Sequence, residues 1–236
     1  MNFPDPLIQG RLIKRYKRFL TDVELESGEV VVAHCANPGS MLSLLEEGAE
    51  VWLSPARNPA RKLKYTWEMI NIGGSLVGLN TALPNKIVQE AIEDGLIPEL
   101  VGYDSLRPEV KYGKNSRIDI LLEGENVPIC YVEIKSVTMS RPEKGDNLAE
   151  FPDSVTARGT KHLQELSDQV AEGKRAVMLY LVQREDCNEF SVAADIDPAY
   201  AAGLKAAKLA GVETLCYGCS VSPEAINIAR KLKITS

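Results

Sequence analysis

Two acidic residues and a lysine stand in adjacent apolar segments near the middle of the chain, within the stretch 117–137. Asp119 interrupts the first apolar run, and Glu133 and Lys135 alternate with apolar residues in the second. Successive side chains of a strand point to opposite faces, so Glu133 and Lys135 share one face of a strand that should be largely buried. Buried charges are costly unless they are paired or bind a metal. The pattern predicts a divalent-cation site, in which carboxylates hold the ion and the lysine orients or activates a water that attacks a phosphate.

The acid-x-Lys pattern alone is not specific, because it occurs at 109–111, 133–135 and 172–174. The last copy resembles a helix end followed by a turn. The first copy could be a strand, but it has no partner acid on a preceding strand, and Gly113 ends it early. Only the copy at 133–135 has apolar neighbours on both sides and an Asp-bearing strand before it. From these residues alone, a surface ion pair at a sheet edge remains the alternative to a metal site.

The segments around these residues predict an α/β domain, because strand-like runs alternate with helix-like spacing after residue 110. The polar segment 138–160 is expected to be a long loop of functional or mobile character. We expect strands around Asp119 and Glu133 and at 176–182 and 212–217, and helices at 86–94, 160–170, 198–210 and 222–232.

Residues 1–80 follow another pattern, with four to six short strands separated by turns and one short helix at 42–47. This pattern predicts a small closed β-barrel of the OB type. Basic residues gather in two clusters with aromatic residues nearby, which is typical of barrels that bind nucleic acid, although a solvated strand face is the alternative. The clusters are Arg11, Lys14, Arg15, Lys17 and Arg18, then Arg57, Arg61, Lys62 and Lys64, and the aromatic residues are Tyr16, Phe19, Tyr65 and Trp67.

The composition narrows the class of protein further. The net charge of −6 over 236 residues argues against a protein that coats nucleic acid generally, although the basic residues of the first part are clustered. There is no apolar run long enough to span a membrane, and the first residues lack the features of a signal peptide. Five cysteines, with only Cys216 and Cys219 at C-x-x-C spacing, predict buried thiols in a reducing compartment. We therefore expect a cytoplasmic protein without membrane contact.

Several long blocks resemble the sugar fermentation stimulation protein A family, and the resemblance runs in order through essentially the whole chain. It implies an OB-like nucleic-acid-binding barrel at 1–80 and a restriction-endonuclease-like α/β domain of the PD-(D/E)xK nuclease type at 81–236. It also implies DNA binding and a link to the regulation of maltose utilisation in bacteria. The blocks that carry the resemblance are 12–19, 34–41, 65–68, 109–113, 116–119, 131–138, 151–163 and 172–177.

The resemblance places Asp119, Glu133 and Lys135 in the nuclease-type core and Glu90, on the preceding helix, as an additional acid. Asp119, Glu133 and the backbone carbonyl of Ile134 would hold Mg²⁺ or Mn²⁺. Ile118 stands where many such sites have proline before the aspartate.

For the nucleic acid, we expect phosphate contacts from one group of basic residues and base stacking on two aromatic residues. Two functions fit this reading: a metal-dependent DNA phosphodiesterase, or a non-catalytic DNA-binding transcriptional regulator on a nuclease-like scaffold. The oligomeric state stays open, a homodimer included. The phosphate-binding residues expected are Arg15, Lys17, Arg18, Lys62 and Lys161, and the stacking residues are Tyr65 and Trp67.

Overall fold

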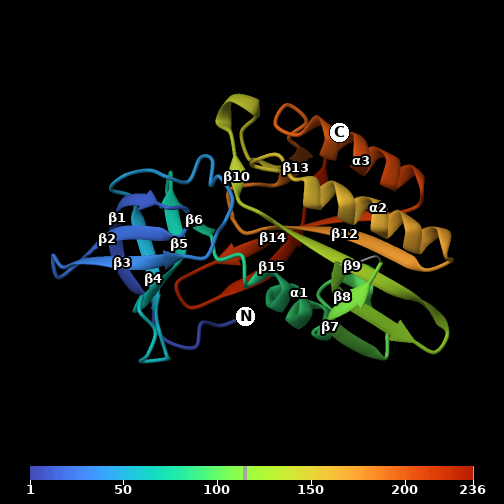
Figure 1. Cartoon of the computed structure of the whole chain (residues 1–236), viewed down its shortest axis with the longest axis horizontal. Helices are drawn as coiled ribbons and strands as arrows, with labels where there is room; N and C mark the ends of the chain where they lie inside the picture. The colour runs from blue at the N-terminus through green and yellow to red at the C-terminus, as the bar shows by residue number, and fades with distance from the viewer. Residues whose placement is uncertain (114–115, 236) are drawn as a thin grey trace.

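The barrel and the α/β part lie side by side in the computed structural model, which describes residues 1–113 and 116–235 (Figure 1). The barrel strands lie in the order β3-β2-β1-β4-β5, and a parallel pairing of β3 with β5 closes the cylinder. The small closed barrel that the sequence predicted is thus confirmed; it has five strands, and β6 pairs with β5 as an addition. The strands are β1 (Ile8–Tyr16), β2 (Leu20–Leu25), β3 (Val30–Cys35), β4 (Glu50–Pro55), β5 (Tyr65–Ile72) and β6 (Ser75–Gly78).

The short helix expected at 42–47 is wrong, because this segment contains only turns. Met41 and Ser43 have φ values of 55° and 69°, which a right-handed helix does not allow. The apolar spacing that suggested a helix has another cause, since Met41 and Leu44 are buried at the end of the barrel.

The sequence predicted an α/β domain, and the structure confirms it: a six-stranded mixed sheet forms the centre of this part. Its strand order is β15-β14-β12-β9-β8-β7, with β12 parallel to both β9 and β14. The central strand, β12, is almost wholly buried, which explains its continuous apolar sequence. The strands are β7 (Ser105–Tyr112), β8 (Ser116–Gly124), β9 (Val127–Val137), β12 (Arg175–Val182), β14 (Glu213–Val221) and β15 (Ile226–Lys231).

Helices cover both faces of this sheet. Helix α1 (Pro84–Glu93) packs on one face against β8, β9 and β15, and α2 (Ala157–Ala171) and α3 (Pro198–Leu209) cover the other. None of the helices in the described ranges has the length and hydrophobicity needed to cross a membrane. The Thr156 hydroxyl accepts a hydrogen bond from the Gly159 N–H at 3.1 Å and caps the start of α2. The cap fixes the first turn of α2, which faces β9.

The helix expected at 222–232 is wrong, because this segment contains a turn and the edge strand β15, and the short strand β16 (Lys233–Ile234) follows it. Ile226 and Ile228 lie on β15, which pairs antiparallel with β14. Burial of Ile226 and Leu232 against the sheet outweighs the helical propensity of the alanine, lysine and leucine residues in the segment.

The polar segment 138–160 contains more regular structure than expected. It includes β10 (Met139–Ser140) and β11 (Leu148–Phe151), which join β13 (Glu189–Val192) and β16 in a four-stranded sheet. Two short 3₁₀ turns, at Pro98–Leu100 and Pro142–Lys144, complete the elements.

Backbone hydrogen bonds join the barrel to the central sheet. The Gly78 N–H at the end of β6 donates to the Gln183 carbonyl, just beyond β12, at 2.8 Å. The Val77–Arg184 bridge lies beside it. Since β12 is the neighbour of β9, these contacts fix the barrel next to the strand that carries Glu133 and Lys135.

Candidate active site

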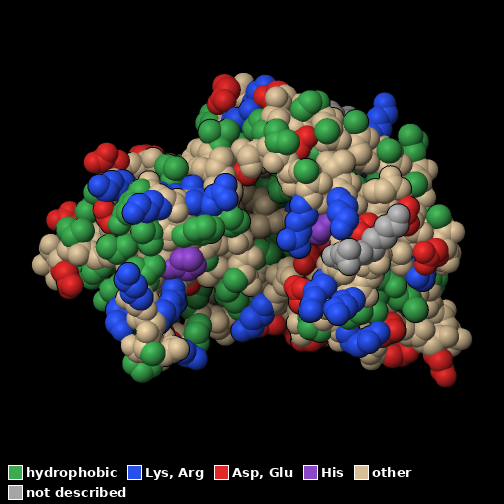
Figure 2. Space-filling view, in the orientation of Figure 1, with side chains coloured by type: hydrophobic (Ala, Val, Ile, Leu, Met, Phe, Trp, Pro, Cys, Tyr) green, Lys and Arg blue, Asp and Glu red, His purple; other side chains and the backbone are tan. Residues whose placement is uncertain are grey.

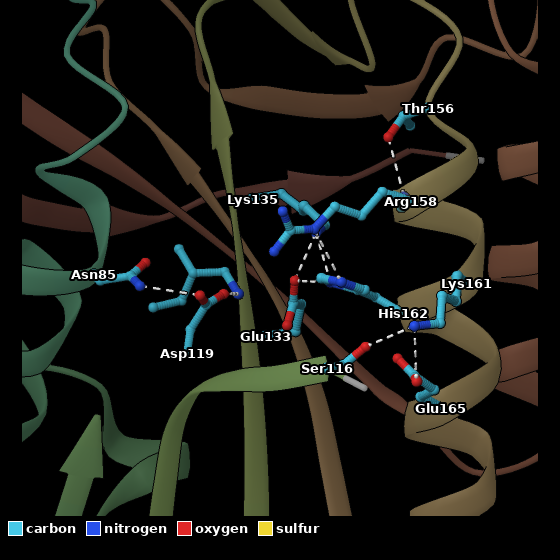
Figure 3. Close-up of polar contacts among 12 residues, drawn as sticks. Asn85, Ser116, Asp119, Glu133, Lys135, Thr156, Arg158, Lys161, His162 and Glu165 are labelled. Carbon is cyan, nitrogen blue, oxygen red and sulfur yellow. Dashed lines mark hydrogen bonds and ion pairs between the residues drawn. The ribbon is translucent and has the colours of Figure 1, made fainter. Parts of the chain in front are cut away.

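Asp119 lies where β8 separates from β9, just beyond the Ile120–Val132 pair of their ladder. Its Oδ2 accepts a hydrogen bond from the Ile134 N–H at 2.7 Å, and its Oδ1 accepts one from the Asn85 Nδ2 at 3.0 Å. Asn85 stands in the first turn of α1. The carboxylate is therefore held from two sides, by the backbone of β9 and by a helix (Figure 3).

Glu133 is 2% exposed and points towards α2. Its Oε1 lies 2.7 Å from the Lys135 Nζ and in hydrogen-bond contact with the His162 Nδ1. The Arg158 Nε donates to the His162 Nε2 at 3.3 Å. Because Nε2 accepts this bond, the neutral ring carries its proton on Nδ1 and donates it to Glu133. Arg158 and His162 are one helical turn apart, so α2 presents both to the β9 acid.

The two acids differ in charge environment. Burial and the charge of Glu133 raise the pKa of Asp119 to about 6, and the bonds from Ile134 and Asn85 only partly oppose this. Burial also acts to raise the pKa of Glu133, but the His162 hydrogen bond and the Lys135 charge outweigh it and hold that pKa below its ordinary value. The pair therefore has one carboxylate in a direct ion pair and one that has no directly paired cation and feels the Lys135 charge only as a minor effect.

The acids line a cavity of about 410 Å³ between the α/β part and the barrel. Glu133 Oε2 is buried and has no hydrogen-bond partner among the described residues. Within the described ranges, no three Asp, Glu, His or Cys side chains form a ready-made metal cluster. Mg²⁺ takes few carboxylates and keeps several waters, so Asp119, Glu133 and the Ile134 carbonyl form a chemically suitable oxygen set. The partnerless oxygen and the raised pKa of Asp119 are both features that a bound cation would relieve.

The barrel forms one wall of this cavity through the loop at Asn37, Pro38 and Gly39. The buried Asn37 side chain donates to the Leu79 carbonyl at 3.2 Å and accepts from the Gly39 N–H at 2.9 Å. Arg15 donates to the carbonyls of Asn37 and Gly39 at 2.9 and 3.0 Å. These hydrogen bonds fix the conformation of the loop at residues 37–39, which lines one side of the cavity.

A polar contact between the barrel and the α/β part borders the cavity at Gly39 and Asp153. The Asp153 carboxylate accepts hydrogen bonds from the Ser40 Oγ at 3.0 Å and from the Met41 N–H at 2.9 Å. The main-chain carbonyl of Asp153 accepts another from the Ser40 Oγ at 2.8 Å. A Cβ at Gly39 would lie 2.7 Å from the same carboxylate, so the contact needs glycine there. We call the contact between Asp153 and residues 40–41 the latch. It joins the barrel to the segment that precedes α2.

Glu90 does not lie beside the acid pair. It is partly exposed, its carboxylate lies 2.9 Å from the Met1 amino nitrogen, and it also pairs with Lys86. The expected role of Glu90 as an additional acid of the site is therefore wrong. Asn85, near the start of the same helix, contacts Asp119 instead. Lys161 is half-exposed on α2 and contacts Ser116 and Glu165, outside the cavity lining.

Two of the expected nucleic-acid contacts in the barrel need correction. Trp67 is fully buried in the barrel core, and its indole N–H donates to the Met69 carbonyl at 3.0 Å, so it cannot stack on a base. The Arg15 guanidinium already donates hydrogen bonds to the backbone carbonyls of Asn37 and Gly39, and it thereby stabilises the loop that lines the cavity. The remaining residues expected to meet nucleic acid are exposed or partly exposed: Lys17, Arg18, Lys62 and Tyr65.

Sequence reasoning missed several residues of the cavity. Asn85 also donates a hydrogen bond to Glu109 Oε1 at 3.1 Å. Glu109, which belongs to the acid-x-Lys copy rejected above as a site, therefore lies close to Asp119. His162 is not among the site residues that the sequence predicted. Its spacing of four residues from Arg158 was the available signal, since that spacing puts both on one face of α2. No local signal marks Asn85 or Asp153, because their partners are distant in sequence.

Comparisons with known proteins match both parts of the chain. A family described as "Sugar fermentation stimulation protein RE domain" matches residues 82–225, and "SfsA N-terminal OB domain" matches 13–79. A sugar fermentation stimulation protein homolog from Paramagnetospirillum magneticum is 58% identical over 232 residues, covering 98% of this chain and 97% of the relative. One from Rhodospirillum rubrum is 58% identical over 230 residues, covering 94% of each. The solved structure of Pyrococcus furiosus SfsA in complex with Ca²⁺ has a TM-score of 0.88 and 27% identity, covering 100% of this chain and 98% of that one.

Proposed function

This chain belongs to the sugar fermentation stimulation protein family, and from that premise we propose that it is a nucleic-acid-binding phosphodiesterase that uses a divalent cation. We assign binding to the barrel, residues 1–80, and chemistry to residues 81–236. The observation that carries the proposal is the cavity in which Asp119, Glu133 and Lys135 meet beside a wall of the barrel. A relative that was solved in complex with Ca²⁺ supports the use of a divalent cation.

Asp119, Glu133 and the Ile134 carbonyl would hold Mg²⁺ or Mn²⁺, which when bound would offset negative charge on the phosphate and acidify a water. Lys135 is 2.7 Å from Glu133 and reaches the cavity, where it orients the attacking water and offsets charge on the phosphate. His162 holds the Glu133 carboxylate in place, and the exposed Arg158 binds a phosphate oxygen at the mouth.

The test is a cleavage assay with purified protein on labelled single-stranded DNA, duplex DNA and RNA, in Mg²⁺, Mn²⁺ or EDTA. We expect metal-dependent cleavage that Glu133→Gln reduces by about 10²-fold or more, the loss typical of a key electrostatic group. The matched control is Glu172→Gln, which changes the acid of another acid-x-Lys copy, one that pairs with Lys174 at the surface. Cleavage that persists in EDTA or in Glu133→Gln would refute the proposal.

A second function, DNA binding without catalysis, is favoured by one observation. Lys135 already neutralises Glu133 without any metal, as in a structural ion pair, and His162 adds a hydrogen bond to the same carboxylate. In that case no substrate is cleaved under any metal condition. Duplex DNA binding would then survive Glu133→Gln and would be lost when Lys17 and Arg18 are replaced by alanine.

A further inference from the structure

An aromatic pair lies at the surface of the barrel. The rings of Phe19 and His34 stack with their centroids 6.3 Å apart and their planes 27° from parallel. Phe19 is 44% exposed and His34 is partly exposed, so the pair is open to solvent. Neither ring belongs to the barrel core. A planar, solvent-accessible pair of this kind is a surface on which a nucleobase can stack.

The turn that carries Phe19 has an unusual backbone. Lys17 and Arg18 both have left-handed φ values, of 48° and 64°, which residues with long side chains rarely adopt. Arg15 Nε donates to the Arg18 carbonyl at 3.0 Å, and the Cys35 N–H donates to the Phe19 carbonyl at 2.9 Å. These bonds hold the strained turn in place. The result is a turn that presents two exposed cations, Lys17 and Arg18, immediately before Phe19 in the chain.

A third cation borders the other side of His34. His34 pairs with Thr66 on the neighbouring strand β5, and the Arg61 Nη2 donates to the Thr66 Oγ1 at 2.8 Å. The aromatic pair is thus flanked by positive charge from two loops. Stacking rings between cations match a chain of bases joined by phosphates, because the rings contact bases and the cations contact the backbone.

The aromatic pair is connected to the cavity by a short stretch of chain. Strand β3 ends at Cys35, and the following residues, Asn37 to Gly39, line the cavity that holds Asp119 and Glu133. Figure 2 shows histidine on the barrel and on the α/β part, on the same face of the molecule, with a hollow between them and basic side chains around it. A bound strand can therefore run from the barrel surface into the hollow.

The shape of the cavity distinguishes a single strand from a duplex. A volume of about 410 Å³ is that of a small-molecule pocket, which suits one nucleotide and its neighbours. The latch holds Asp153 and the loop at Gly39 together at one side of the cavity, which limits the width available there. The bases of a duplex are stacked on each other and are not free to stack on a side chain.

We propose that Phe19 and His34 form a base-stacking site for single-stranded nucleic acid, and that the strand continues past residues 37–39 into the cavity at Asp119 and Glu133. This deepens the proposed function by naming its substrate class, and only the fate of the strand in the cavity rests on that function. Binding at the aromatic pair is a property of the barrel surface and can be measured without catalysis.

The test is fluorescence anisotropy in EDTA with labelled oligo(dT) and a labelled duplex of equal length. Phe19→Ala should weaken oligo(dT) binding roughly 5- to 100-fold, the range for loss of one stacked base, and change duplex binding less than twofold. Phe19→Trp should restore the affinity. Leu209→Ala serves as the control, because Leu209 is also an exposed apolar residue but lies on α3, outside the barrel; this change should have no effect on binding.

Equal effects of Phe19→Ala on both oligonucleotides, no effect on either, or no measurable binding of oligo(dT) by the unaltered protein would overturn the inference. Its failure can be told apart from failure of the proposed function. If Glu133→Gln abolishes cleavage while Phe19→Ala leaves oligo(dT) binding intact, the phosphodiesterase stands and the stacking site falls. If Phe19→Ala selectively weakens oligo(dT) binding and nothing is cleaved, the stacking site stands alone.

Discussion

Replacing Asp119 with asparagine should make the metal-free protein more stable at neutral pH. The pKa of Asp119 is raised from 3.8 to about 6 by burial and by the charge of Glu133. A pKa difference of one pH unit is worth about 1.4 kcal/mol, so ionised Asp119 destabilises the folded state by about 3 kcal/mol. The Asp119→Asn side chain has nearly the shape of the protonated acid and can still accept the Ile134 N–H. The substitution therefore removes the electrostatic destabilisation and keeps the hydrogen bond from the Ile134 N–H.

The sign follows from proton linkage. Because the folded pKa is above the unfolded one, the folded state binds more protons between pH 4 and 6, and stability falls as the pH rises through this window. Asp119→Asn and the unaltered protein should therefore be equally stable near pH 3.5 and differ by up to about 3 kcal/mol at pH 7.5. For a chain of this size, that corresponds to roughly 6–12 °C in melting temperature.

The assay is thermal unfolding followed by circular dichroism in EDTA across this pH range. Asp146→Asn, an exposed loop position, is the control and should not change the melting temperature. Adding Mg²⁺ at pH 7.5 should raise the melting temperature of the unaltered protein and leave that of Asp119→Asn unchanged. A variant that is less stable at pH 7.5, or one whose gain is the same at every pH, would refute the electrostatic account of this site.

Three further outcomes are expected. Trp67→Phe should lower the free energy of unfolding by about 1–2 kcal/mol in urea denaturation, because a core ring shrinks and its bond to Met69 is lost, and should leave oligonucleotide affinity unchanged in anisotropy titrations. Arg15→Lys should cost about 1–3 kcal/mol by the same unfolding assay, because an ammonium group cannot bridge the carbonyls that the guanidinium joins. Asp153→Ala removes the carboxylate acceptor of the latch and leaves only the bond from Ser40 to the main-chain carbonyl, so limited proteolysis near Ser40 should become faster and duplex DNA should be cleaved better relative to single-stranded DNA.

The sequence was sufficient where a residue's role depends on its neighbours along the chain. The alternation around Glu133 and Lys135 predicted a shared strand face, and the structure gives an ion pair of 2.7 Å between them. Short strands with frequent turns predicted the closed barrel. The same local reasoning failed at 222–232, where helix-forming residues are drawn into a sheet edge, and at Trp67, whose aromatic type does not reveal whether it faces the core or the solvent.

The contacts that complete the site join residues far apart in the sequence. Asn85 lies 34 positions from Asp119, and Ser40 lies 113 positions from Asp153. Hydrophobic periodicity says which face of an element is buried but not which element covers it. The two contacts depend on how α1 docks on the sheet and how the barrel docks on the α/β part, and only the tertiary structure supplies that.

The charges of the cavity explain why its two acids are not equivalent. Lys135 and His162 both engage Glu133, whereas Asp119 has only neutral donors, from Ile134 and Asn85. Their pKa values are consequently pushed apart, a separation that is common where carboxylates have different tasks. In the function proposed above, the Asp119 carboxylate, which has no directly paired cation, would bind the metal ion, and the partnerless Oε2 of Glu133 would bind the same ion. A structural ion pair alone would account for Glu133 and Lys135, but it would not explain why a second carboxylate, that of Asp119, is buried beside them without a cationic partner.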